Sequence, residues 1–132
     1  MDFRNRLYGI DGIGERDEVF RVGGITIDLK NVLVTVDGEP MDFRLREFEL
    51  LVALAAKPGR LRTRKELASK IWGDADARSS RTIDVHVRRV RSKLAERTGH
   101  DYVRTVRGFG YRLVEPGPSP DASPDGVAGA PA

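Results

Sequence analysis

The sequence has no cysteine, which excludes a disulfide framework and a metal site with cysteine ligands. Its two histidines, His86 and His100, stand apart in the sequence without a third ligand arranged around them, so we expect no metal. No apolar run reaches the roughly 18 residues of a membrane-spanning helix, and no apolar segment of the signal-peptide kind follows the N-terminus. These absences predict a protein without metal or membrane partner, and make the cytoplasm its simplest location.

The parts of a catalytic site are also lacking. No nucleophile stands near a base in a recognisable pattern, and the glycine pair in residues 107–110 is too short and wrongly placed for a loop that cradles phosphate at the start of a helix. Glu47 and Glu49 lie two residues apart in a predicted helix and so do not face each other. We interpret them as surface and cap partners. The sequence therefore predicts a protein that is not an enzyme and that takes no cofactor or small-molecule substrate.

Positive charge is concentrated in one part of the chain. The formal net charge is only +3, but residues 60–114 hold 15 Lys and Arg against 6 Asp and Glu, whereas residues 1–59 hold 8 against 11. Such an asymmetry predicts a surface that binds a polyanion. Arg outnumbers Lys 18 to 5, which favours bidentate recognition by guanidinium groups, although a GC-rich genome would produce the same bias.

The length and patterning predict one folded domain, at residues 19–115. Residues 1–18 have no sustained periodicity and are interpreted as a linker or N-terminal extension. Residues 116–132 are rich in Pro, Gly, Ser, Asp and Ala, a composition that buries too little apolar surface to fold, so we expect a disordered tail.

The domain begins with four short predicted strands, separated by hairpin turns that contain glycine. They cover residues 19–22, 25–28, 32–36 and 40–43. Three helices are predicted next. The first covers about residues 45–57. The second starts at a capping box formed by Thr63 and Glu66 and ends at Trp72, and the third covers residues 81–94. Ser79 or Ser80 can cap the third helix.

Two more strands follow, at residues 102–106 and 111–114. This order predicts an α+β fold: a winged helix-turn-helix with an N-terminal four-stranded antiparallel sheet, three helices and a C-terminal β-hairpin wing.

The third predicted helix is amphipathic in an unusual way. At 3.6 residues per turn, Ile83, Val87, Val90 and Leu94 form one apolar stripe, which we expect to face the core. The residues of the opposite face are Arg81, Val85, Arg88, Arg89 and Ser92. Arg suits phosphate and guanine, and Val85 suits a thymine methyl group. The alternative is a plain solvated face, but only Asp84 and Glu96 offset the six cations of residues 81–97.

The predicted wing turns through residues 107–110. Gly108 and Gly110 permit positive φ angles in a tight turn, and Arg107 would project from it. Phe109 is either exposed at the tip or folded back on the core, and the residues alone favour neither.

Three blocks of sequence carry a resemblance: REFELLVALAAKPGRLRTRKELASKIWG, RTIDVHVRRVRSKL and YVRTVRGFGYRL, which together cover residues 46–113 with two short gaps. The chain resembles the winged-helix effector domain of OmpR/PhoB-type response regulators of bacterial two-component systems. The resemblance implies transcription regulation by sequence-specific binding of double-stranded DNA, with the third helix in the major groove and the wing in the flanking minor groove.

The resemblance also implies roles for individual residues. The implied phosphate contacts are Trp72, Arg81, Thr82, His86, Arg88, Thr105 and Tyr111. The implied base or groove contacts are Arg89, Arg91 and Arg107, although the helical periodicity places Arg91 toward a flank. Residues 73–80, with Gly73, Asp74 and Asp76, are similar to a segment that touches RNA polymerase in this family, and a plain connector is the alternative. Family members typically bind direct repeats, with a second copy arranged head to tail.

Two features depart from the family pattern. Arg44 stands where a capping Thr usually precedes the first helix, and Asp42 can cap instead. No βαβ pattern with an acidic pocket precedes Val19, so this is either an excised effector domain or one whose regulatory domain is of another kind. An alternative function for the whole is a winged-helix module that binds an acidic protein partner.

Overall fold

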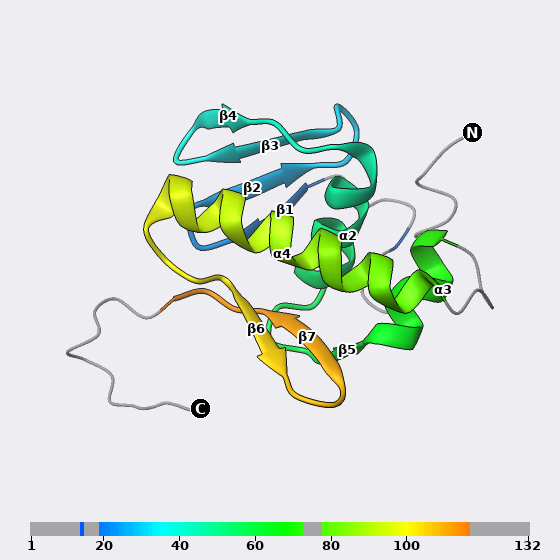
Figure 1. Ribbon diagram of the computed structural model, residues 1–132. Helices are drawn as coiled ribbons and strands as arrows, with labels where there is room; N and C mark the ends of the chain where they lie inside the picture. The colour runs from blue at the N-terminus through cyan, green and yellow to red at the C-terminus, as the bar shows by residue number, and fades with distance from the viewer. Residues whose placement is uncertain (1–13, 15–18, 73–77, 117–132) are drawn as a thin grey trace.

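Two antiparallel sheets and three helices make up the part of the chain that the structure, a computed structural model, describes: residue 14 and residues 19–72 and 78–116 (Figure 1). Most of the predicted N-terminal extension and tail lie outside it. The elements in chain order are β1 (Val19–Val22), β2 (Ile25–Asp28), β3 (Leu33–Val36), β4 (Glu39–Met41), α2 (Leu45–Ala55), β5 (Arg62–Thr63), α3 (Arg64–Trp72), α4 (Arg78–Thr98), β6 (Val103–Val106) and β7 (Gly110–Leu113).

The N-terminal sheet has the order β1-β2-β3-β4, as predicted. Asp37 and Gly38 both take positive φ angles, 50° and 87°, in the tight turn between β3 and β4. The third strand begins one residue later than predicted, because Val32 has a φ of 53° and so cannot continue an extended strand. One face of the sheet is buried, so the sheet supplies one wall of the core.

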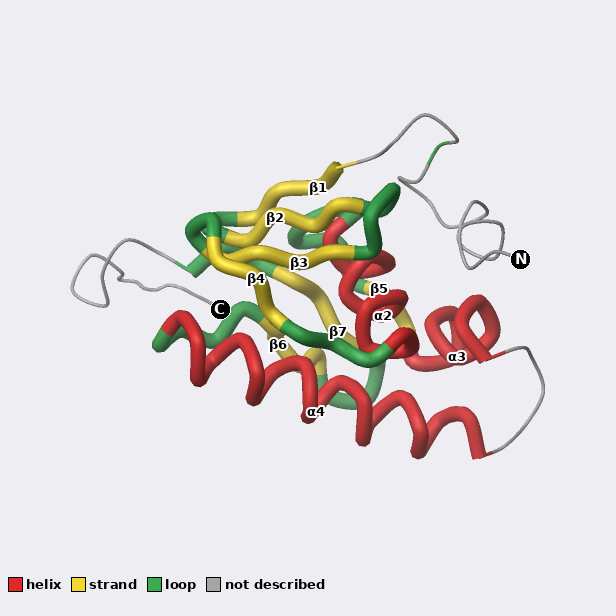
Figure 2. The backbone as a smooth tube through the Cα atoms, turned by 90° about the horizontal axis from the view of Figure 1, so that it is seen from above, coloured by secondary structure: helices red, strands yellow, loops and turns green. Residues whose placement is uncertain are grey.

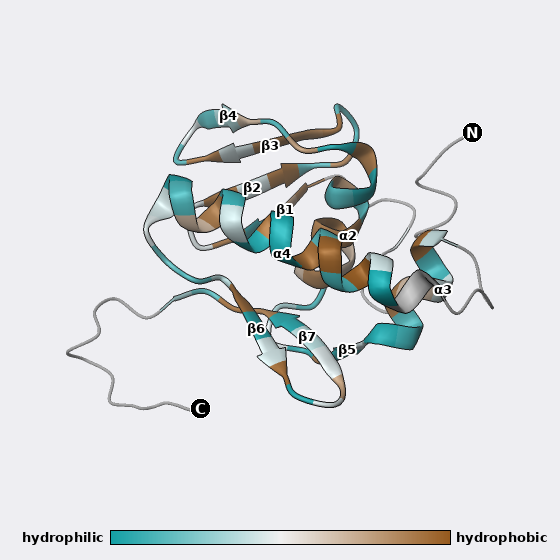
Figure 3. Ribbon diagram, in the orientation of Figure 1, coloured by the Kyte–Doolittle hydropathy of each residue, from teal (hydrophilic) through white to brown (hydrophobic). Residues whose placement is uncertain are grey.

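The helices supply the other walls. Figure 2 shows α2 lying inside the fold between the N-terminal sheet and the long α4. Helix α2 is buried along most of its length. In Figure 3, hydrophobic colour gathers on α2, whereas α4 alternates between hydrophobic and hydrophilic bands, as an amphipathic helix does. No helix within residues 19–72 and 78–116 is long and apolar enough to cross a membrane.

The start of α2 corrects two predictions. Its N-cap residue is Arg44, whose N–H donates to Glu47 Oε1 at 3.0 Å, so Glu47 supplies the cap that we expected from Asp42. Glu47 and Glu49 are not on the surface, because their exposed fractions are 1% and 0%. Glu47 is covered where α4 packs over α2, and Lys93 of α4 donates to its carboxylate at 2.6 Å.

Two helix boundaries also differ from the prediction. The long helix α4 begins at Arg78, so Ser79 and Ser80 occupy positions in its first turn and not the N-cap position that we predicted. Helix α2 ends at Ala55, before the predicted Lys57. The capping box of α3 is confirmed: the N–H of Glu66 donates to Thr63 Oγ1 at 3.0 Å, and the N–H of Thr63 donates to Glu66 Oε1 at 3.4 Å.

The wing is part of a three-stranded sheet that the sequence did not predict. Strand β5 pairs with β7, so the order is β5-β7-β6. Gly108 takes a φ of +85° as expected, but Gly110 is needed for a different reason. A Cβ atom on Gly110 would lie 2.0 Å from the carbonyl oxygen of Arg62, so only glycine lets β5 approach this closely.

Candidate nucleic-acid interface

The long helix α4 presents the two faces that its periodicity predicts. Ile83, Val87, Val90 and Leu94 are all buried in the core, which confirms the apolar stripe. The opposite face is open to solvent and carries Arg81, Val85, Arg88, Arg89 and Ser92. Val85 is an aliphatic side chain, 39% exposed, among these guanidinium groups. Such a face can contact phosphate, base edges and a thymine methyl group from one rigid element.

The end of α3 meets one flank of α4. The ring of Trp72 lies edge-on to the ring of His86, with 4.9 Å between their centroids. His86 Nδ1 lies 2.8 Å from the carbonyl oxygen of Thr82. Because a carbonyl oxygen only accepts, Nδ1 carries the proton in this contact, which leaves Nε2 as the other polar atom of the ring. The fold thus brings three predicted phosphate contacts, Trp72, Thr82 and His86, to one place.

An ion pair and a hydroxyl group connect α3, α4 and β7. Arg64 donates to the carboxylate of Asp84 from Nε at 3.1 Å and from Nη2 at 2.6 Å. Tyr111 donates its hydroxyl proton to Asp84 Oδ1 at 2.7 Å. Burial and this hydrogen bond raise the pKa of Tyr111 to about 12, so the hydroxyl stays protonated and keeps its role as donor. We call Arg64, Asp84 and Tyr111 the interhelix triad.

The interhelix triad has two consequences for the interface. The carboxylate of Asp84 is paired with the guanidinium group of Arg64, so its negative charge repels a polyanion less than a free carboxylate would. The hydroxyl of Tyr111 is already bonded and its side chain is buried, so its contact with phosphate stays a prediction. Nothing in the sequence indicated the triad, because its members are 20 and 27 residues apart.

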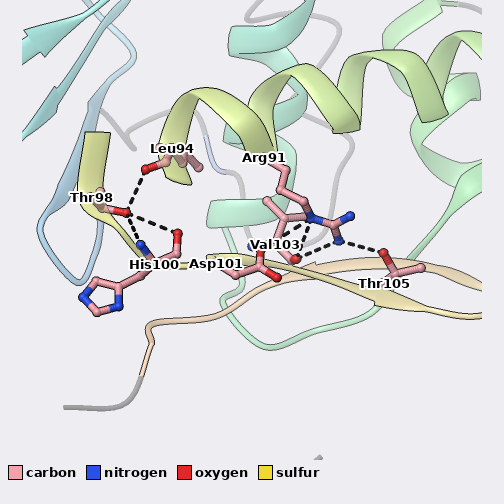
Figure 4. Close-up of polar contacts among 7 residues, drawn as sticks. All are labelled: Arg91, Leu94, Thr98, His100, Asp101, Val103 and Thr105. Atoms are coloured by element: carbon pink, nitrogen blue, oxygen red, sulfur yellow. Dashed lines mark hydrogen bonds and ion pairs between the residues drawn. The ribbon is translucent and has the colours of Figure 1, made fainter. Parts of the chain in front are cut away.

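Arg91 joins α4 to the wing (Figure 4). Its Nε and Nη2 donate to the carbonyl oxygen of Val103 at 3.2 and 2.8 Å, and Nη2 also donates to Thr105 Oγ1 at 2.7 Å. Asp101 lies 3.4 Å from Nε. The guanidinium group therefore holds strand β6 against the helix, and a base contact from Arg91 stays a prediction.

The same close-up shows how the chain turns from α4 toward β6. Thr98 donates its hydroxyl to the carbonyl oxygen of Leu94 at 2.7 Å and accepts from the N–H of His100 at 3.0 Å (Figure 4). Gly99 takes a φ of +78° at this helix end. This local arrangement fixes the direction in which the wing leaves the helix.

The tip of the wing is open to solvent. Phe109 is 62% exposed, which decides between the two alternatives that the sequence left open. Arg107 is also exposed. A cleft of about 190 Å³ separates the wing from the helices and is lined by Arg64, Asp84, Thr105, Val106, Arg107, Gly108, Gly110 and Tyr111. The cleft therefore joins the exposed face of the wing to that of α4 in one continuous surface.

Two further predictions concern other parts of the molecule. Gly73, Asp74 and Asp76, the predicted polymerase contacts, lie outside the described residues. Within the described ranges, no group of three or more His, Cys, Asp or Glu side chains could hold a metal ion.

Known proteins are similar to this chain in sequence and in fold. Residues 38–113 match the family described as "Transcriptional regulatory protein, C terminal". The sensory transduction protein RegX3 of Mycolicibacterium smegmatis is 39% identical over 104 residues, which cover 78% of this chain and 46% of RegX3. The phosphate regulon transcriptional regulatory protein PhoB of Pseudomonas aeruginosa is 38% identical over 102 residues, covering 77% and 44%. The chain thus spans less than half the length of these two relatives.

Solved structures agree with the sequence comparison. The DNA-binding domain of RstA from Klebsiella pneumoniae, in complex with the RstA box, is similar with a TM-score of 0.66 and 29% identity, covering 75% of this chain and 99% of that one. The DNA-binding domain of CpxR from E. coli has a TM-score of 0.67 and 28% identity, covering 75% and 98%. The chain therefore belongs to the transcriptional regulatory protein C-terminal family, and its fold is the winged helix of the OmpR/PhoB-type DNA-binding domains.

Proposed function

We propose that this chain regulates transcription by binding double-stranded DNA at a preferred sequence, with α4 in the major groove and the β6–β7 wing in the adjacent minor groove. The observation that carries the proposal is the outward face of α4, where Arg81, Arg88 and Arg89 are exposed on one rigid helix. A helix of this width fits a major groove about 12 Å wide. The similar RstA DNA-binding domain was solved in complex with the RstA box, which supports the same role here.

The predicted contact residues divide into two groups, those that would contact bases and those that would contact phosphates. We assign Arg89 and Val85 to base edges: family membership implies this role for Arg89, and the exposed side chain of Val85 suits a thymine methyl group. We assign Trp72, Arg81, Thr82, His86 and Arg88 to phosphates on either side of the groove, and Thr105 and Tyr111 to phosphates beside the wing. Arg107 would enter the minor groove. Arg91 would act mainly by holding the wing against α4, because its guanidinium group is bonded to β6.

The same reasoning extends to assembly on DNA. We infer that two copies bind a direct repeat head to tail, as is typical of the family that the chain belongs to. Gly73, Asp74 and Asp76 would then face RNA polymerase from the segment between α3 and α4. These inferences rest on family membership, and the sequence selected from random duplexes would test the first through the spacing of its half-sites.

A pair of variants tests the division between base and phosphate contacts. Selection from random duplexes first defines the preferred site. Arg89→Ala should then relax preference at one base pair, since a bidentate Arg–guanine contact is worth about 1–3 kcal/mol of discrimination. Arg88→Ala should weaken binding to every duplex about equally, because phosphate contacts carry no sequence information. Arg21→Ala removes the same charge from β1, outside α4 and the wing, and serves as the matched control.

The outcomes distinguish sequence-specific DNA binding from a winged-helix module that binds an acidic protein. Neutralisation of roughly six phosphates by Arg and Lys side chains would give a log–log salt slope near −5 for one domain. If Arg89→Ala shows the same base preference as wild type on all single-base variants of the site, Arg89 does not contact a base. Weak binding without any preferred sequence, together with tight binding to an acidic protein, would favour a protein-interaction module instead.

A further inference from the structure

The tip of the wing carries a large aromatic side chain in solvent. The exposed large hydrophobic residues among those described are Val19, Val32, Leu33, Leu45, Val85 and Phe109, and Phe109 is the most exposed at 62%. Isolated apolar residues on a surface are common and need no explanation. Phe109 stands out among them because it is the largest and most exposed and lies at the tip of the wing, two residues from the exposed Arg107.

The backbone of Phe109 is fixed on both sides. Its N–H donates to the carbonyl oxygen of Val106 at 2.9 Å, which closes the turn of the wing. Its carbonyl oxygen accepts from the N–H of Arg64 at 3.2 Å, which ties the tip to the start of α3. Gly110, the next residue, packs directly against β5. Because the backbone is already ordered, only the side chain of Phe109 loses conformational entropy when it binds a partner.

The surroundings of Phe109 are those of the proposed DNA surface. Arg107 precedes it by two residues and is exposed at the same tip. The cleft between the wing and α4 is lined by residues on both sides of Phe109, including Gly108 and Gly110. Arg107 lines this cleft and Phe109 does not, so a partner lying over the tip of the wing would meet the cation at the cleft and the exposed aromatic ring at the tip. Proteins that bind the minor groove combine such a cation with an apolar side chain inserted between base pairs.

We propose that Phe109 is a wedge that enters the minor groove beside Arg107 and partly unstacks one base-pair step next to the site read by α4. This proposal rests on the proposed function. Unstacking is easiest at pyrimidine–purine steps such as TA and CA. Phe109 therefore makes the protein prefer a flexible step at that position, and it does so without a hydrogen bond to any base. Arg107 favours a narrow A·T-rich minor groove, so the two neighbouring residues read different properties of the flanking DNA.

The experiment compares three flanks around one selected core site: a TA step, a stiff A-tract without that step, and a G·C-rich segment. A 2-aminopurine base at the flanking step reports unstacking as a rise in fluorescence. The proteins are wild type, Phe109→Ala, Arg107→Ala and the control Leu45→Ala, which removes an exposed apolar side chain from α2. Wild type and the control should raise the fluorescence and bind the TA flank most tightly.

Phe109→Ala should lose the fluorescence rise and the advantage of the TA flank over the A-tract, with affinity about 10-fold to 100-fold lower on the TA flank. It should keep its base preference in the core site and its preference for A·T over G·C flanks, whereas Arg107→Ala should lose the A·T preference.

Three results would overturn the proposal. In the first, Phe109→Ala unstacks the step and ranks the flanks as wild type does. In the second, it binds one half-site normally but loses cooperative binding to two, which would make Phe109 a contact between protein copies. In the third, wild type selects no DNA sequence, in which case the proposed function fails as well. Only this last result removes the core-site preference of every variant.

Discussion

Gly110 offers a sharp test of how the wing is held. In Gly110→Ala, the new Cβ would lie 2.0 Å from the carbonyl oxygen of Arg62, 2.8 Å from Thr63 Cα and 2.9 Å from the carbonyl carbon of Arg62. All three are backbone atoms of β5, so no side-chain rotation relieves the overlap. The two strands must move apart by roughly 1 Å or more to restore van der Waals contact, which disrupts the pairing of Arg62 with Tyr111.

The expected loss follows from the overlap. Overpacking a well-packed site typically costs about 1–3 kcal/mol. Loss of strand pairing adds to this, so we expect the free energy of unfolding to fall by about 3 kcal/mol or more. In a domain of this size, each kcal/mol shifts Tm by about 4–8 °C. Gly110→Ala should therefore melt at least about 12 °C below wild type, and urea denaturation should give the same order.

Gly108→Ala is the matched control, since it adds the same methyl group two residues away, in the turn that precedes β7. No atom lies within 4 Å of its new Cβ, and the only cost is the φ of +85°. That conformation costs a residue with a side chain about 1–2 kcal/mol. If Gly108→Ala lost as much stability as Gly110→Ala, or more, the close approach of β5 would not be the reason for glycine at position 110.

Three further predictions concern stability. Val32→Asn should raise the free energy of unfolding by about 1 kcal/mol in urea denaturation, since Asn tolerates the φ of 53° that strains a β-branched residue; an unchanged or lower midpoint would show that Val32 is not strained. The pKa of Tyr111 is raised from 10.0 to about 12, so its contribution to stability should be fully present below pH 10 and be lost as the pH rises from 10 through about 12. Tyr111→Phe, which has no proton to lose, should flatten this alkaline decline in the free energy of unfolding; equal alkaline slopes for the two proteins would contradict the bond to Asp84. Arg62→Met should lower the free energy of unfolding by about 1–3 kcal/mol, because the carbonyl oxygen of Ala53 loses a buried donor; a variant as stable as wild type by thermal denaturation would refute this.

Arg62 shows one limit of reading the sequence. It is a charged residue in a two-residue strand, and it is fully buried. Its Nε donates to the carbonyl oxygen of Ala53 at 3.2 Å, where the last carbonyls of α2 lack partners within the helix, and Nη1 lies 3.3 Å from Glu66. No basic residue stands in the last turn of α2, so a residue from another element supplies the positive charge there. A two-residue strand has no periodicity to detect, so neither β5 nor this role was predictable.

The sequence by itself determined the features that depend on neighbours within about one helical turn or one hairpin. The apolar stripe of α4, the capping box of Thr63 and Glu66 and the paired strands of the N-terminal sheet were predicted correctly, because their residues interact at fixed short spacings. The family and the arginine-rich outward face of α4 follow from the same local patterns.

The tertiary structure alone decided which distant residues meet. Lys93 meets Glu47, Tyr111 meets Asp84, and Gly110 meets the backbone of Arg62 only after the chain has folded. The first contact gives the buried carboxylate of Glu47, which was predicted to lie on the surface, a cationic partner, and the other two hold the wing against α4 and β5. A linear pattern specifies which face of an element is apolar, but the partner that covers that face is set by the packing of the whole core.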